Sequence, residues 1–329
     1  MNAADPAQTI MELTTAYWVS RCLHVVAELG VADALDEVPR TAAELAGKTG
    51  AEASALHRVL RALANHGIFE LQAGRFAHND ASRLLRAGVE GSQRARARMF
   101  GLPVWWNAYG ALGQTVRTGL PAVESVTGQS LFPYLAAHPE QARIFAETMA
   151  GMSRGRVGPV LDSYDFQGAE VIGDIGGGLG HVLKAVLATN LQASGILFDR
   201  PEVIAQASQE AVARIRYVAG DFFRDPIPAC DVYLLMRVLH DWPDADSVAI
   251  LRNLRADARP GARVLVLEGV LDEETLGILA DIDIEMLTMT GGRERTREDW
   301  QRVLDEAGLS LRRILPTPSV TSIIEAVVP

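Results

Sequence analysis

A cluster of glycines behind a short apolar run is the first feature of this sequence that could do chemistry. The chain reads Asp174-Ile175-Gly176-Gly177-Gly178-Leu179-Gly180-His181 after an apolar run that begins at Val171. Glycines let the backbone approach a ligand closely at the carboxyl end of a strand. A dinucleotide fingerprint counted from Gly176 would need its third glycine where His181 stands. The spacing at Gly176 and Gly178 is instead typical of a loop for the methionyl part of S-adenosylmethionine, although a tight turn without a ligand would need the same glycines.

Two further apolar runs end in residues that suit a nucleoside. Asp199 follows the run 195–198, and its carboxylate could accept hydrogen bonds from both hydroxyls of a ribose. Asp221 and Phe222 follow the run 217–219, where they would offer an acceptor for an adenine amino group beside an aromatic face. Because the carboxyl ends of parallel strands meet at one edge of a sheet, we expect the three sets of residues to lie together.

Two later blocks carry a resemblance to a known family. They are Leu239-His240-Asp241-Trp242, with Arg237 just before it, and Gly291-Gly292-Arg293-Glu294-Arg295-Thr296. With them the chain resembles, over nearly its whole length, the bacterial and plant small-molecule O-methyltransferases that use S-adenosylmethionine and act on phenolic natural products. The resemblance implies that His240 is the general base, that Arg237 contacts the cofactor, and that Glu268 and Glu294 flank the histidine.

Elementary acid–base chemistry agrees with a basic role for His240. A phenol has a pKa of about 10 and an ordinary histidine one of about 6.5, so the base should remove the proton while the oxygen attacks the methyl group. The alternative is a histidine at a helix start that bonds only to the backbone. A family member that methylates nitrogen, or that catalyses decarboxylation or hydroxylation, is a second alternative. It is disfavoured because an already neutral amine needs no base beside Glu268 and Glu294.

The expected substrate is a flat, largely apolar, hydroxylated aromatic compound of one to three rings. Methionine side chains adapt to ring edges, and no cluster of Lys or Arg accompanies them here. Met289 stands where plant members often have an asparagine that contacts the substrate, so a particular substrate does not carry over. Neither a metal nor a metal-dependent reaction is implied. The residues in segments that resemble the family's pocket walls are Phe145, Met149, Met152, Met286 and Met289.

The elements that must position these residues fall into two parts. In 161–329, apolar runs alternate with helical segments, which predicts a Rossmann-like, doubly wound parallel sheet that binds S-adenosylmethionine. In 1–160 the apolar spacing predicts helices, including one over Ile10–Leu35 and one over Glu52–His66, followed by a hairpin at 68–77. This outline is that of a winged helix. Too few basic residues accompany it for binding to DNA, so we expect a module for dimerisation that also contributes to the substrate pocket.

Composition excludes several classes of protein. The 329 residues carry a net charge of −10, and the whole acidic excess lies in 161–329, so neither half offers the basic surface that nucleic acid needs. No apolar stretch is long enough for a membrane helix, and the first residues do not look like a secretory signal. Cys22 and Cys230 allow at most one disulfide. We therefore expect a cytoplasmic homodimer without nucleic-acid or membrane partners.

Overall fold

The computed structural model describes residues 5–329, apart from the side chain of Arg154. Residues 1–4, on which the expectation about a secretory signal partly rests, lie outside the described residues. The chain forms two compact units, Met1–Trp106 with His138–Gly151, and Asn107–Ala137 with Met152–Pro329. The division expected at residue 160 stays a prediction. Among the described residues, no helix is both long and apolar enough to cross a bilayer.

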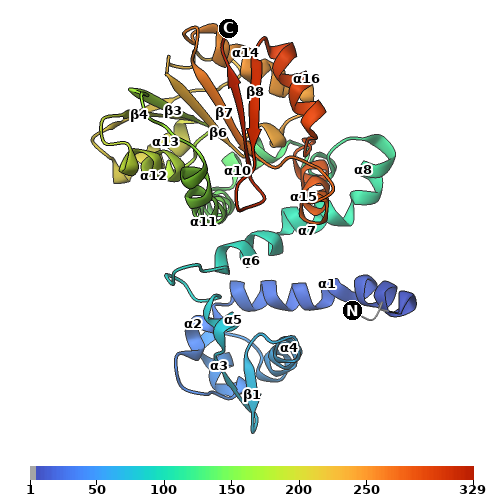
Figure 1. Ribbon diagram of the computed structural model, residues 1–329. Helices are drawn as coiled ribbons and strands as arrows, with labels where there is room; N and C mark the ends of the chain where they lie inside the picture. The colour runs from blue at the N-terminus through green and yellow to red at the C-terminus, as the bar shows by residue number, and fades with distance from the viewer. Residues whose placement is uncertain (1–4) are drawn as a thin grey trace. The chain divides into compact units, whose positions relative to one another are not determined.

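Short helices and a hairpin make up the first unit (Figure 1). The single helix predicted over Ile10–Leu35 is wrong in one respect, because Gly30 adopts a left-handed φ of 65° and divides it in two. Thr41 and Glu44 form a capping box at the start of the helix that begins at Ala42. The elements are α1 (Pro6–Glu28), α2 (Val31–Leu35), α3 (Ala42–Thr49), α4 (Ala53–Asn65), β1 (Glu70–Gln72), β2 (Arg75–Ala77), α5 (Asp80–Arg83), α6 (Arg94–Gly101), the first turn of α7 (Pro103–Gly110) and the first half of α11 (Pro139–Ser163).

The outer part of α1 is apolar and exposed. Its large side chains have no partner surface within their own unit, in contrast to Val26 and Ala27 near the end of the same helix, which are buried. Exposed apolar side chains that gather in this way are typical of an interaction surface. The exposed side chains are Ile10, Met11, Leu13, Tyr17 and Trp18.

The second unit contains a seven-stranded sheet with helices on both faces (Figure 1). Its strand order is β5-β4-β3-β6-β7-β9-β8, and β3 to β7 are parallel, as predicted. The antiparallel pair β8 and β9 was not predicted. The strands are β3 (Val171–Ile175), β4 (Ser194–Asp199), β5 (Ile215–Ala219), β6 (Val232–Met236), β7 (Arg263–Glu268), β8 (Ser310–Leu315) and β9 (Ser322–Val327).

Alternation along the buried strands divides the core into two layers. On β7, Val264 and Val266 join the cluster under α14 and α16, whereas Leu265 and Leu267 join the cluster under α12, α13 and the end of α11. The helices that complete this unit are α8 (Leu112–Thr118), α9 (Ala122–Thr127), α10 (Leu131–Ala137), α12 (His181–Thr189), α13 (Pro201–Ala207), α14 (Asp244–Ala256), α15 (Leu276–Met289) and α16 (Arg297–Ala307), with 3₁₀ turns η1 (Ser208–Glu210) and η2 (Leu239–Asp241).

The strand order fixes where a ligand site can form. β3 pairs with β4 on one side and with β6 on the other. The chain adds β4 and β5 on one side of β3 and then β6 and β7 on the other, so the strand order reverses between β3 and β6. In doubly wound sheets, ligands bind outside the carboxyl ends of the strands at this switch point. The predicted site residues after β3, β4, β5, β6 and β7 all follow carboxyl ends at this edge.

Candidate active site

The glycine loop after β3 has the backbone that its sequence predicts. Gly176, Gly178 and Gly180 adopt φ values of 68°, 58° and 75°, a region that side chains disfavour. A Cβ at Gly178 would meet no atom within 4 Å, so the backbone faces open space there. A Cβ at Gly177 would instead collide with the carboxylate of Asp174. The loop therefore closes tightly over Asp174 and leaves its other side accessible to a ligand.

Asp199 lies at the end of β4, where its carboxylate bonds to the glycine loop. Its Oδ2 accepts the backbone N–H of Gly178 at 2.8 Å, and its Oδ1 accepts that of Arg200 at 2.7 Å. Burial raises the pKa of this carboxyl above its ordinary value. Each oxygen has capacity for a second bond. The side chain thus both braces the loop and can still accept from a ribose.

Asp174 is a residue that the sequence analysis did not single out. It is fully buried on β3, and neither of its carboxylate oxygens has a hydrogen-bond partner among the described residues. Burial raises its pKa to about 7. Buried polar atoms in native proteins are nearly always bonded, and the exceptions often mark ligand sites. A charged residue inside an apolar run, directly before the glycines, was the available signal.

Asp221 and Phe222 follow β5 as predicted. Asp221 Oδ1 accepts the backbone N–H of Phe223 at 2.9 Å, which fixes the turn and leaves the other oxygen available. The Phe222 ring lies edge-to-face against Trp242, with ring centroids 5.9 Å apart. It also lies close to Gly176, because a Cβ there would be 3.6 Å from the ring. Strand order thus places an aromatic face beside the glycine loop.

His240 stands on η2, the short turn that follows β6. Its imidazole is 3% exposed, and its Nδ1 lies 2.7 Å from Oε1 of Glu294. Its Nε2 lies 3.7 Å from Oδ1 of Asp241, beyond hydrogen-bond distance. Burial and the nearby Arg237 cation lower its pKa to about 3. The imidazole is therefore neutral at neutral pH, as a base must be.

Glu294 decides which imidazole nitrogen can act. Burial raises its pKa to about 7, and its backbone N–H donates to Asp283 at 2.7 Å. When this carboxylate is ionised, Nδ1–H of His240 donates to it and the Nε2 lone pair is free to accept a proton. When the carboxyl of Glu294 is protonated, its O–H donates to Nδ1 of His240, so the imidazole proton lies on Nε2 and that nitrogen cannot accept another. The charge on Glu294 thus selects the basic nitrogen.

Glu268 contacts the backbone of the turn rather than the imidazole. Its Oε1 accepts the backbone N–H groups of Val238, Leu239 and His240 at 3.0, 2.7 and 3.3 Å. Burial raises its pKa, and its Oε2 has no hydrogen-bond partner among the described residues. The resemblance implies a glutamate that flanks the histidine; the structure places this one beneath the turn, where it holds three amides.

Arg237 has a strained backbone at the start of the same turn. Its φ of 55° is left-handed, a conformation that costs a residue with a side chain about 1–2 kcal/mol. Its Nε is buried and has no hydrogen-bond partner within the described part of the chain. Strain of this kind persists where the surrounding structure imposes it, often at functional sites. Arg237 therefore has an N–H group available for a ligand, and the surrounding structure holds its backbone in a strained conformation at the switch point.

The residues expected to form the substrate wall lie on two helices. On α11, Phe145 and Met149 belong to the first unit and Met152 to the second; all three are partly buried. The Phe145 ring stacks on Trp105, with centroids 6.1 Å apart. Met286 and Met289 are buried on α15. Their role at a substrate stays a prediction.

Two further arginines act on the site and were missed. Arg156, on α11, lowers the pKa of His240 and of Glu294 through its charge. Arg295 is fully buried beside η2. The sequence did not indicate Arg156 as a site residue, because α11 comes near the carboxyl ends of the strands only in the folded structure. In the described part of the protein, no cluster of three or more His, Cys, Asp or Glu side chains is arranged to hold a metal ion.

Comparison with known families agrees with this geometry. Residues 109–310, more than half of the chain, match the model of an O-methyltransferase domain. The chain belongs to the O-methyltransferase family. Residues 11–88 match the O-methyltransferase dimerisation domain. The predicted family, enzyme class and fold class are therefore confirmed, and the winged-helix outline corresponds to a dimerisation module.

Members of the O-methyltransferase family similar to this chain act on different aromatic compounds. A phenazine O-methyltransferase of Lysobacter antibioticus is 40% identical over 333 residues, 99% of this chain and 97% of the relative. An 8-amino-8-demethylriboflavin N,N-dimethyltransferase of Streptomyces davaonensis is 37% identical over 332 residues, with 97% and 94% covered. The crystal structure of an O-methyltransferase from neocarzinostatin biosynthesis, in complex with S-adenosylmethionine and 2-hydroxy-5-methyl naphthoic acid, matches with a TM-score of 0.84 and 31% identity, over 94% of this chain and 96% of that one.

Proposed function

We propose that this protein methylates a phenolic hydroxyl of an aromatic secondary metabolite, with S-adenosylmethionine as the donor and His240 as the general base. The observation that carries the proposal is the pair formed by His240 and Glu294. The carboxylate bonds to Nδ1 at 2.7 Å, and no hydrogen bond to the described residues occupies Nε2. A neutral imidazole held by one nitrogen, with the other available, is the arrangement that general-base catalysis requires.

The residues at the switch point fit S-adenosylmethionine. Gly178 presents backbone to open space, Asp199 retains acceptor capacity for ribose hydroxyls, and Phe222 offers a ring face beside the loop. The unpartnered oxygens of Asp174 can accept and the unpartnered Nε of Arg237 can donate, which suits the ammonium and the carboxylate of a methionyl group respectively. When bound, S-adenosylmethionine supplies an electrophilic methyl group on a sulfonium. The neocarzinostatin-pathway relative contains it.

Within this site the protein's own residues handle the proton. Glu294 holds Nδ1–H, so Nε2 of His240 accepts the phenolic proton as the oxygen becomes nucleophilic. The imidazolium formed is then stabilised by Glu294 through the same hydrogen bond. Glu268 keeps the backbone of the turn in place through three amides. Positioned proton transfer of this kind is worth about 10²–10⁴-fold in rate.

Transfer to nitrogen is the second candidate, because the riboflavin-type relative is an N,N-dimethyltransferase. A neutral aromatic amine attacks without prior loss of a proton. The buried pair of His240 and Glu294 would then have no proton to remove before transfer. We therefore favour oxygen.

The decisive experiment is a screen for methyl transfer from isotope-labelled S-adenosylmethionine. The acceptors are hydroxyphenazines, hydroxynaphthoic acids and single-ring phenols, each beside the matched aromatic amine, with and without EDTA. We expect a labelled methyl ether that forms equally in the presence of the chelator. Methylation of the amines alone, or activity that EDTA abolishes, would overturn the proposal.

The first unit supports a homodimer. It matches a dimerisation domain, and the outer half of α1 exposes a row of large apolar side chains that needs a partner surface. A second copy of the chain provides an identical surface through a two-fold axis. Light scattering at micromolar concentration should give about twice the mass of 35.5 kDa; the monomer mass would contradict the assignment.

A further inference from the structure

We propose that Arg295 is a positioning residue for His240, and that its guanidinium fixes the turn that carries the imidazole. This inference rests on the proposed role of His240 as the base. It concerns a residue that touches neither the imidazole nor any atom placed at the reaction centre. Its side chain instead reaches the backbone on either side of His240.

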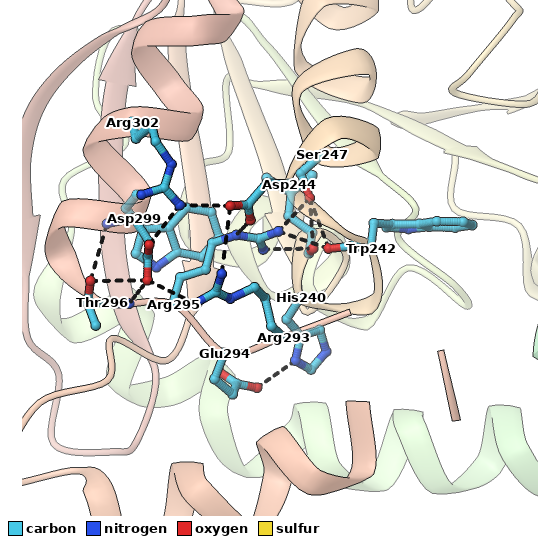
Figure 2. A network of polar contacts seen from close by, with 12 residues as sticks. His240, Trp242, Asp244, Ser247, Arg293, Glu294, Arg295, Thr296, Asp299 and Arg302 are labelled. Carbon is cyan, nitrogen blue, oxygen red and sulfur yellow. Dashed lines mark hydrogen bonds and ion pairs between the residues drawn. The ribbon is translucent and has the colours of Figure 1, made fainter. Parts of the chain in front are cut away.

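The guanidinium of Arg295 makes four hydrogen bonds around the turn (Figure 2). Nη1 donates to the carbonyl of Leu239 at 2.9 Å, and Nη2 donates to the carbonyl of Trp242 at 2.8 Å. Nη2 also donates to Ser247 Oγ, and Nε donates to Asp244 Oδ1, both at 2.9 Å. Arg295 thus spans the residue before His240, the end of the turn and the first turn of α14.

The turn needs this support because it is short. Leu239–Asp241 forms one 3₁₀ turn, in which few backbone groups can bond to one another. Glu268 satisfies three of its amides from one side. Arg295 satisfies two of its flanking carbonyls from the other. These two side chains, together with Ser247 and the backbone N–H of Arg293, hold the backbone from which His240 projects.

Arg295 also links this support to the orienting carboxylate. It follows Glu294 directly in sequence, so one of two adjacent side chains bonds the imidazole and the other bonds the carbonyls of Leu239 and Trp242. The backbone N–H of Arg293 donates to the carbonyl of His240 at 2.9 Å, and that of Leu271 donates to the carbonyl of Arg295 at 2.8 Å. A displacement of Arg295 would therefore move the turn relative to Glu294.

Only arginine can make this set of contacts. Its planar fork presents five N–H donors in fixed directions and remains charged, whereas a lysine has three donors on one atom. The cation lies 5.1 Å from the ring centroid of the buried Trp300, and Asp244 balances its charge. A misplacement of a catalytic group by about 1 Å can reduce a rate by about 10². Loss of the fork should therefore affect turnover without contact with a substrate.

The test compares Arg295→Lys with the matched control Arg302→Lys. Arg302 bonds to the same Asp244, and to Asp299, both at 2.7 Å, but no bond joins it to the turn. We expect Arg295→Lys to lower kcat by about 10- to 100-fold, with the dissociation constant of S-adenosylmethionine, measured by calorimetry, within about twofold of wild type. Arg302→Lys should leave both quantities within about twofold. The acceptor is the phenol that reacts fastest in the panel described above.

A double-mutant cycle with His240→Gln separates positioning from general support of the fold. If Arg295 acts through His240, Arg295→Lys should lower the residual rate of the His240→Gln variant by less than about twofold. Hydrogen exchange of peptides that cover 236–243 should increase in Arg295→Lys and not in Arg302→Lys. An equal loss in both backgrounds, or wild-type kcat in a folded Arg295→Lys variant, would overturn the proposal.

Two further outcomes are distinguishable. If Arg295→Lys does not fold, Ser247→Ala takes its place, because it removes one acceptor of Arg295 and one donor to Leu239; a several-fold loss of kcat supports the proposal and an unchanged kcat overturns it. If His240→Gln retains full turnover, the proposed base fails. Exchange at 236–243 still decides whether Arg295 fixes the turn.

Discussion

The loop after β3 and the turn after β6 follow the carboxyl ends of adjacent strands, yet they differ in how far their buried polar groups are hydrogen-bonded. Beneath the glycine loop, both oxygens of Asp174 are buried without hydrogen-bond partners among the described residues. Around η2, in contrast, Glu268 and Arg295 bond the backbone on both sides of His240. The glycine loop leaves a buried carboxylate unbonded, whereas the turn has its backbone bonded on both sides and leaves only side-chain atoms, Nε of Arg237 and Oε2 of Glu268, without a partner among the described residues.

This difference follows from what each region has to do. A group that must bind a ligand needs donors and acceptors that the protein itself does not satisfy, at a cost of about 1–3 kcal/mol for each buried group. A group that must transfer a proton needs one orientation, which is obtained by satisfying everything around it. Unpartnered atoms thus mark the proposed cofactor site, and a turn whose backbone is bonded on both sides marks the proposed base.

The largest effect on activity should come from a substitution on the turn after β6. His240→Gln keeps a similar size but cannot take a proton, so kcat should fall by about 10²–10⁴-fold. Affinity for S-adenosylmethionine should stay unchanged, because the glycine loop is not disturbed. Rates come from single-turnover assays and affinities from calorimetry. Near-wild-type turnover would remove His240 from the role of base, and a loss confined to affinity would assign it to the other region.

A substitution of Asp199 tests the proposed S-adenosylmethionine site beside the glycine loop. Asp199→Ala removes the acceptor proposed for the ribose and leaves the amides of Gly178 and Arg200 unbonded, so we expect a loss of about 2–3 kcal/mol in S-adenosylmethionine affinity. At saturating cofactor, kcat should change little. Asp199→Asn is the matched control, since it keeps the size and one acceptor, and its loss should be smaller. Undiminished affinity in the alanine variant would exclude Asp199 from the site.

The pH profile gives the smallest effect and the sharpest distinction between proton transfer and binding. Burial raises the pKa of Glu294 to about 7 and lowers that of His240 to about 3, so the pair takes up one proton as the pH falls through about 7. Nε2 is basic only before that uptake, and kcat should therefore rise with pH through about 7.

Glu294→Gln supplies the control for this profile. The amide does not titrate, so the limb near pH 7 should disappear, while the maximal rate falls about tenfold because the ring is still held by one hydrogen bond. The other charged groups that face His240 are unchanged in this variant. They are Arg237, Glu268, Asp241, Arg156 and Arg295. A limb that persists near pH 7 would assign the titration to one of these groups.

Short-range patterns predicted much of the fold. The five parallel strands and the glycine loop were predictable because an apolar run followed by glycines leaves few alternatives for a backbone. The break at Gly30 was missed, since apolar spacing continues across it. β8 was missed because it is largely exposed and its residues show no strong alternation, and β9, although buried, has the charged Glu325 in the middle of its short apolar run.

The candidate site also contains residues that the sequence predicted and contacts that it did not. Asp199, His240 and Glu294 were predictable from position after a strand or from the family blocks. The contact of Glu268 with three amides was not, because it depends on the conformation of a turn that spacing does not define. Arg295 was visible inside the block around Glu294, but its four bonds join segments about fifty residues apart in the sequence. Contacts over such separations are set by tertiary structure alone.

The position of β9 has a consequence for biosynthesis. β9 lies between β7 and β8, and Ser322 is paired with Glu268, the residue that holds the amides of the turn. Until Ser322–Val327 has left the ribosome, β7 is an open edge and Glu268 has no neighbour on that side. Domains generally fold as units during synthesis. We therefore expect a chain terminated shortly before β9 to leave its central sheet exposed at β7 rather than to yield a smaller active enzyme.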